Sequence, residues 1–254
     1  MSTNYTAAVP AELHGKCAVI TGGNRGIGFA IAEALASRGC SVVLTSRSAA
    51  SAEEAASRLS AYGARVVPFQ CDVRDEMAVE RLFATVREQF GRLDFLINNA
   101  GIYGPAVPIH QIPTAGWRET LDTNLTGTFL CTKYAIPLMC GTGTPACRGA
   151  VIVNNLSIAA YQVFPNSAAY IASKQGMLGL TNATREDLRS RGIRVVALVP
   201  GATDTEIWNQ FWPEAPRQRM MRPKDVADAV VTALLMPEGT SVDEIRIMPA
   251  GGAL

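Results

Sequence analysis

Short runs of β-branched and other apolar residues alternate along the chain with longer segments in which apolar residues recur every three or four positions. The clearest of these segments has apolar residues at 79, 82, 83, 86 and 90, a spacing that places them on one face of an amphipathic helix. Alternation of short strands with such helices is typical of a parallel sheet covered on both faces. We therefore predict an α/β fold built on a doubly wound parallel sheet of about seven strands.

The same pattern predicts the order of the elements. Strands are expected at 18–21, 41–45, 65–70, 93–97, 150–154, 194–199 and 244–248. Helices are expected at 29–38, 50–62, 79–90, 117–138, 167–190 and 223–235. No linker rich in Pro, Gly or Ser interrupts the series, so we expect an N-terminal arm at 1–15 followed by a single domain at 16–254.

Composition narrows the choice of partners. The chain has 254 residues, of which 48% are apolar and 18% charged, and this balance suits a soluble protein with a sizeable core. A net charge of +1 gives no reason to expect nucleic acid or an anionic membrane as a partner. The arm before Lys16 contains no apolar run, so neither a signal peptide nor a membrane anchor is expected.

Cysteine and histidine usage bears on compartment and metal binding. No two cysteines form a CxxC pair, and several lie in apolar segments, so all six are expected to be buried thiols of a cytoplasmic protein: Cys17, Cys40, Cys71, Cys131, Cys140 and Cys147. With His14 and His110 as the only histidines, we predict no metal site and no histidine-based catalytic triad.

A glycine-rich turn joins the first predicted strand to the first helix. It places Gly22, Gly26 and Gly28 where backbone N–H groups and a helix N-terminus can receive a pyrophosphate. The spacing is GxxxGxG rather than GxGxxG, and such turns also occur for packing alone. With the strand-helix context, the turn favours a Rossmann-type dinucleotide-binding domain.

The second predicted strand ends at Ser46 and Arg47, without a carboxylate that could bind a ribose diol. Arg25 in the glycine turn adds a second guanidinium, and two guanidiniums suit a 2′-phosphate, so NADP(H) is the expected cofactor. The alternative is that Arg47 is an ordinary surface residue. Asp72, after the third strand, is expected either beside the adenine or as an ordinary acid at a helix N-terminus.

Tyr170 and Lys174 are four residues apart, which in a helix places the phenol and the ammonium on one face. A fixed cation beside a phenol favours the phenolate and brings its pKa toward the range useful for acid-base catalysis. The alternative is a solvated helix face.

These motifs together resemble the short-chain dehydrogenase/reductase family over nearly the whole chain after the arm. The resemblance is carried by Thr21 to Gly28, Asn98 to Gly101, Asn124, Ser157, Tyr170 to Lys174 and Pro200 to Thr205. It implies that Tyr170 is the general acid/base, that Lys174 lowers its pKa, that Ser157 binds the substrate oxygen and that Asn124 holds a water of a proton relay. It also implies a set of cofactor-binding residues: Gly22, Asn24, Arg25, Gly26, Ile27, Gly28, Ser46, Arg47, Asp72, Val73, Asn99, Ala100, Gly101, Tyr170, Lys174, Pro200, Gly201, Thr203 and Thr205.

The activity implied by the resemblance is hydride transfer between NADP(H) and a ketone or aldehyde and its alcohol, in a homodimer or homotetramer. A 3-oxoacyl-thioester reductase acting on an acyl carrier protein and a non-catalytic NADP(H) sensor stay open as alternatives. Where many relatives have Ile-Ser-Ser, this chain has Asn155-Leu156-Ser157, so Ser157 is the sole serine candidate.

Residues 204–221 are rich in Trp, Phe and Pro and are predicted to form an insert near the substrate. The aromatic residues there either form a lid over an apolar substrate or pack the insert onto the domain or another subunit.

Overall fold

The computed structural model describes residues 13–140, 147 and 149–252, and these form a seven-stranded sheet. The strands are β1 (Cys17–Ile20), β2 (Ser41–Ser46), β3 (Val66–Gln70), β4 (Phe95–Asn98), β5 (Val151–Asn155), β6 (Arg194–Pro200) and β7 (Glu244–Ile247). Their order in the sheet is β3-β2-β1-β4-β5-β6-β7, and every neighbouring pair is parallel. The predicted doubly wound parallel sheet is therefore confirmed.

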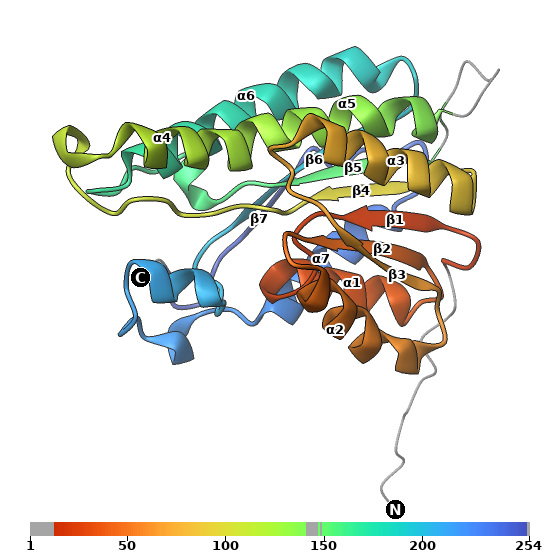
Figure 1. Cartoon of the computed structure of the whole chain (residues 1–254), viewed down its shortest axis with the longest axis horizontal. Helices are drawn as coiled ribbons and strands as arrows, with labels where there is room; N and C mark the ends of the chain where they lie inside the picture. Colours follow the sequence, from red (N-terminus) through yellow and green to blue (C-terminus); the bar gives the residue numbers. More distant parts are fainter. Residues whose placement is uncertain (1–12, 141–146, 148, 253–254) are drawn as a thin grey trace, which may run out of the picture.

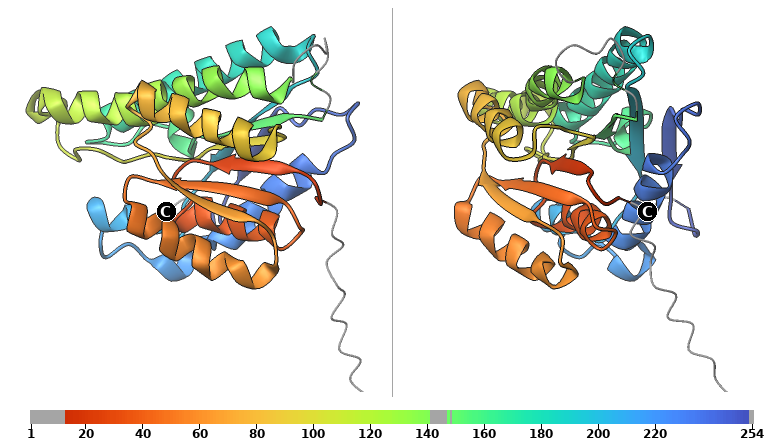
Figure 2. Two further views of the ribbon diagram at one scale, coloured as in Figure 1. Left: turned by 45° about the vertical axis from the view of Figure 1, so that its right-hand side comes forward. Right: turned by 90° about the vertical axis from the view of Figure 1, so that its right-hand side faces the viewer.

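Helices cover both faces of this sheet. They are α1 (Gly26–Ala36), α2 (Ala49–Leu59), α3 (Glu76–Phe90), α4 (Thr114–Leu121), α5 (Gly127–Met139), α6 (Ala168–Arg189) and α7 (Pro223–Leu234). Helices α1, α2 and α7 lie on one face, while α3, α4, α5 and α6 lie on the other (Figure 1). The two turned views show the same three-layer arrangement (Figure 2).

The core is divided by the sheet because side chains of a strand point alternately to its two faces. In β1, Ala18 and Ile20 join the cluster under α1, α2 and α7, whereas Cys17 and Val19 join the cluster under α3 and α5. All four are buried, as expected for a central parallel strand covered on both faces. The sheet is thus a rigid base from whose carboxyl edge the connecting loops project.

The helix predicted at 117–138 contains a change of period. A π-helical turn, Asp122–Thr126, separates α4 from α5 and carries Asn124 at its centre. Such single π turns inside α-helices occur frequently at functional sites. The period of the flanking apolar residues does not reveal it, because one extra residue in a turn shifts the pattern only slightly.

The prediction that all six cysteines are free thiols is wrong for two of them. Cys140 at the end of α5 and Cys147 before β5 form a disulfide, whereas Cys17, Cys40, Cys71 and Cys131 are free and buried. The pairing arises because the chain returns from α5 to β5 and brings the two Cα atoms to 4.3 Å, which spacing in the sequence does not indicate. Most of the predicted N-terminal arm lies outside the described residues.

Among the described residues, no helix has the length and apolar character needed to cross a membrane.

Candidate active site

A cavity of about 660 Å³ lies along the carboxyl ends of the strands. It extends across β1 and β4, where the strand order reverses and where open α/β sheets bind their ligands. Its wall includes all the predicted site residues except Gly28 and Asn124. Residues as far apart in the sequence as Asn24 and Thr205 thus meet in one cavity.

The glycine turn forms one wall of the cavity. Gly22 and Gly26 have φ of 61° and 53°, a region of backbone conformation that favours glycine. A Cβ on Gly28 would lie 2.3 Å from the side-chain nitrogen of Asn99 and 2.4 Å from the carbonyl oxygen of Gly22. Gly28 therefore allows the turn to pack closely and does not itself face the cavity.

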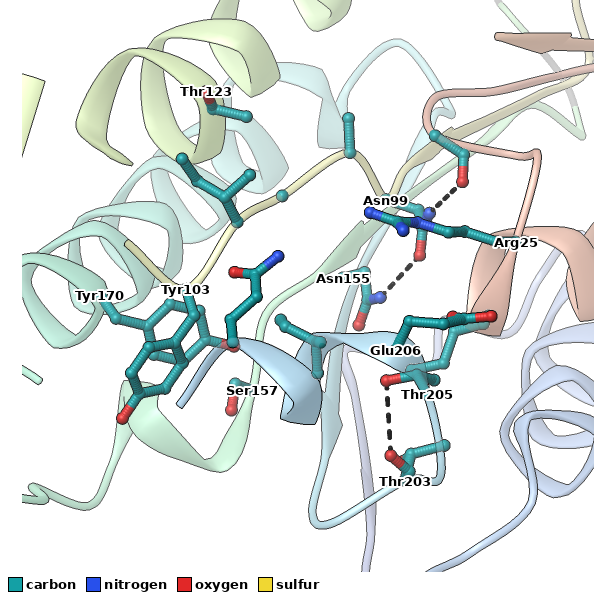
Figure 3. A pocket seen from close by; sticks show the side chains of 18 of the residues that line it. Arg25, Asn99, Tyr103, Thr123, Asn155, Ser157, Tyr170, Thr203, Thr205 and Glu206 are labelled. Atoms are coloured by element: carbon teal, nitrogen blue, oxygen red, sulfur yellow. Dashed lines mark hydrogen bonds between the residues drawn. The ribbon is translucent and has the colours of Figure 1, made fainter. Parts of the chain in front are cut away.

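The side-chain amides of Asn99 and Asn155 hold this turn in place through hydrogen bonds. The Asn99 Nδ2 donates to the carbonyls of Thr21 and Gly22 at 3.0 and 2.9 Å, so its Oδ1 faces the other way. Asn155 Nδ2 donates to that oxygen at 2.9 Å (Figure 3). Asn155 was not among the predicted site residues, although its position in place of the usual isoleucine was the signal that could have identified it.

One end of the cavity is formed by the ends of β2 and β3. Ser46, Arg47, Asp72 and Val73 all line it, and Arg25 reaches toward the cavity from the glycine turn (Figure 3). The Arg47 side chain is 58% exposed. An exposed guanidinium next to the Ser46 hydroxyl can pair with the oxygens of a phosphate ester.

The opposite end of the cavity holds Ser157, Tyr170 and Lys174. Tyr170 and Lys174 lie one turn apart on α6, and Ser157 follows β5 at the start of a short 3-10 turn. The Ser157 hydroxyl is near enough to Tyr170 to act toward a lower pKa of the phenol. Lys174 Nζ lies 5.6 Å from the centre of the Tyr170 ring and donates to the carbonyl oxygen of Asn155 at 2.8 Å. The structure therefore brings three of the four predicted catalytic side chains to one wall.

Burial sets the protonation of these groups. It raises the pKa of Tyr170 to about 12, with Tyr103 adding to the rise and the Ser157 hydrogen bond opposing it. It lowers the pKa of Lys174 to about 7. Loss of hydration penalises the charged form of each group. With this pKa Tyr170 is a protonated phenol at neutral pH, and the role of Lys174 in lowering the Tyr170 pKa stays a prediction.

The buried lysine predicts a pH dependence of stability. Between about pH 7 and pH 10.5 the unfolded chain binds a proton at Lys174 that the folded protein does not, so the free energy of unfolding increases with pH. This contribution should be absent in Lys174→Met. The difference in the free energy of unfolding between wild type and Lys174→Met should therefore change by up to about 1.4 kcal/mol per pH unit. Urea unfolding at pH 7, 8 and 9 measures it, with Lys224→Met on the surface of α7 as the matched control. Parallel pH profiles of wild type and Lys174→Met would contradict the prediction.

Asn124 lies behind the cavity wall. Its Oδ1 accepts from the backbone N–H of Ile102 at 2.8 Å, and its Nδ2 donates to the Ile102 carbonyl and to Ser173 Oγ, each at 2.9 Å. The side chain thus fixes the loop after β4 against α6. Its role in a proton relay stays a prediction.

An aromatic stack covers Tyr170. The Tyr103 ring lies 4.8 Å from the Tyr170 ring, and the Phe211 ring lies 3.8 Å from Tyr103 on the other side, with an interplanar angle of 8°. Trp208 and Trp212 continue the cluster. All five of these aromatic residues line the cavity, so at least part of the insert contributes directly to the cavity wall: Tyr103, Tyr170, Trp208, Phe211 and Trp212.

One further carboxylate lines the cavity. Glu206 follows Thr205 beside the start of α1, where a Cβ on Gly26 would be 3.8 Å from its Oε2 (Figure 3). It was not predicted as a site residue, although its position directly after the predicted Thr205 was a signal that could have identified it. The position depends on how residues 204–221 fold back toward the glycine turn.

Known proteins resemble this chain in sequence and in structure. A family model described as short chain dehydrogenase matches residues 16–216. The chain is 36% identical over 223 residues to the cis-4-hydroxycyclohexanecarboxylate dehydrogenase of Sinomonas cyclohexanicum, covering 85% of this chain and 87% of that protein. It is 33% identical over 204 residues to the 3beta-hydroxysteroid dehydrogenase of Mediterraneibacter gnavus, covering 80% and 72%. A crystal structure of a metagenomic short-chain oxidoreductase in complex with NADP matches with a TM-score of 0.81 and 30% identity, covering 94% of this chain and 98% of that one.

Proposed function

Because the chain belongs to the short-chain dehydrogenase family of nicotinamide-dependent oxidoreductases, which act on alcohol or ketone groups, we propose that it uses NADP(H) to interconvert a cyclic ketone and its secondary alcohol. The observation that carries the proposal is the stack of Tyr103 and Phe211 on Tyr170, which places an apolar, flat wall beside the predicted proton donor.

In the proposed reaction the bound cofactor supplies or accepts the hydride. Ser157 donates a hydrogen bond to the substrate oxygen, and the Tyr170 hydroxyl gives its proton to the alkoxide that forms there. A phenol with a pKa raised to about 12 is fully protonated at neutral pH, which suits the direction of reduction. Lys174, held by the Asn155 carbonyl beneath Tyr170, orients the ribose of the cofactor.

The substrate class is inferred from the wall and from the relatives. Aromatic faces favour offset stacking with other rings and exclude water from apolar ones. The two relatives described above are named for alcohols on a cyclohexane and on a steroid ring. A ring-bearing ketone fits both observations better than a linear acyl thioester.

The choice of NADP(H) is supported by Arg25 and Arg47 and by the NADP complex of the structural relative. Formation of a homodimer or homotetramer, location in the cytoplasm and a single domain at 16–254 also belong to the proposal.

A panel assay tests the substrate class. We expect NADPH oxidation with substituted cyclohexanones to exceed that with linear ketones of equal carbon number by at least about tenfold in kcat/KM. Equal rates on both series would contradict the proposed class. Tight binding of NADPH without turnover on the whole panel would instead indicate a cofactor-binding protein without this activity.

The aromatic wall gives a sharper prediction. Phe211→Ala removes the ring stacked on Tyr103 and should raise KM for a cyclic ketone roughly tenfold while leaving KM for a linear one within about twofold. Steady-state kinetics on the two substrates measure the difference. Tyr62→Ala removes an exposed aromatic side chain that does not line the cavity and serves as the control. If KM rises equally for both substrates, Phe211 supports the fold of the insert and does not recognise the substrate ring.

A further inference from the structure

We propose that Arg74, which does not itself line the cavity, is a positioning residue for cofactor selectivity. It binds the one carboxylate at the β2–β3 end of the cavity and so keeps that end favourable for a phosphate monoester. The inference rests on the proposed use of NADP(H).

Arg74 holds Asp72 from several directions. Its Nε lies 3.0 Å from both carboxylate oxygens of Asp72, and its Nη2 lies 2.6 Å from Oδ2. The backbone N–H of Arg74 also donates to Oδ1 at 3.0 Å. These contacts fix the plane of the carboxylate and pair its charge with a guanidinium in a fork geometry.

Asp72 lies beside the end of β2, where the 2′-phosphate is proposed to bind. The N–H of Cys71 donates to the Ser46 carbonyl at 2.9 Å, so the chain reaches Asp72 directly beside the end of β2. Asp72, Ser46 and Arg47 all line the cavity. The hydrogen bond from Arg74 keeps the pKa of Asp72 below its usual value, and the nearby charge of Arg47 acts in the same direction.

A second carboxylate, Glu119 on α4, takes part in the network. Arg74 Nη1 lies 3.1 Å from Glu119 Oε1, whereas Arg47 Nη1 is 3.8 Å from the same oxygen. Arg74 therefore occupies both carboxylates and leaves Arg47 weakly paired. Without Arg74, the charges of Asp72 and Glu119 would act on Arg47, which lies near both of them.

The consequence for selectivity is electrostatic. A freed Asp72 carboxylate beside the end of β2 would repel a phosphate monoester, whereas it would not repel the uncharged ribose diol of NAD(H). It would also compete with the phosphate for Arg47. Loss of Arg74 should thus shift the preference between the two cofactors and not merely weaken binding.

The test compares NADPH and NADH binding by fluorescence titration of the full chain. We expect Arg74→Gln to raise the dissociation constant for NADPH by about tenfold. The dissociation constant for NADH should stay within about twofold of the wild-type value or decrease. Adding Asp72→Asn to Arg74→Gln should restore most of the NADPH affinity, because the charge that Arg74 pairs is then absent. Arg87→Gln is the control, because it removes an exposed arginine of α3 that does not line the cavity. It should change the dissociation constant of neither cofactor.

Equal weakening of NADPH and NADH by Arg74→Gln would overturn the inference, since a structural defect does not distinguish the two. Failure of Asp72→Asn to restore NADPH binding would also overturn it. Wild-type protein that binds NADH as tightly as NADPH would contradict the proposed cofactor instead, and the same titrations separate these results.

Discussion

Tyr170→Phe should lower kcat for ketone reduction by at least about 100-fold while the dissociation constant for NADPH changes by less than about threefold. The change deletes the hydroxyl that is proposed to protonate the substrate oxygen. It retains the ring that packs against Tyr103 at 4.8 Å, so the cavity wall should persist. Single-turnover kinetics with saturating NADPH separate the chemical step from binding.

Tyr161→Phe is the matched control for this experiment. Tyr161 is 43% exposed, donates its hydroxyl to Glu244 and does not line the cavity. Its loss should leave kcat within about twofold. Full activity of Tyr170→Phe on a good substrate would show that another group transfers the proton.

Arg47→Asp should reverse cofactor preference. It replaces a guanidinium at the end of β2 with a carboxylate, which repels a 2′-phosphate and can accept hydrogen bonds from a ribose diol. We expect the ratio of kcat/KM for NADPH to that for NADH to fall by roughly 100-fold. Because the side chain is 58% exposed, the fold should tolerate the change.

The control for Arg47→Asp is Arg87→Asp, the same charge reversal on an exposed position of α3. It should leave the ratio unchanged. Equal changes in the NADPH and NADH constants of Arg47→Asp would remove the electrostatic argument for NADP(H). Raising ionic strength should reduce the difference between the two cofactors in the wild type, since exposed charges are screened.

The parts of the protein that depend on local spacing follow from the sequence. The strand and helix periods predict the parallel sheet because burial on two faces requires continuous apolar runs in the strands. The glycine turn predicts one wall of the cavity, and the four-residue spacing of Tyr170 and Lys174 predicts that these two side chains lie together. Both features are set by a few consecutive residues of the backbone. The absence of a carboxylate after β2 is likewise visible in the sequence.

Tertiary structure alone decided the features that depend on contacts across the fold. The Tyr103–Phe211 stack, the Asn99–Asn155 amide pair and the Arg74–Glu119 ion pair each join segments at least 45 residues apart. The disulfide between Cys140 and Cys147 depends on the return of the chain from α5 to β5. Most clearly, the spacing of Tyr170 and Lys174 favours a lowered phenol pKa, yet burial by distant side chains raises it. Proximity of two groups is a local property of the chain, but the hydration that sets their charges is a property of everything packed around them.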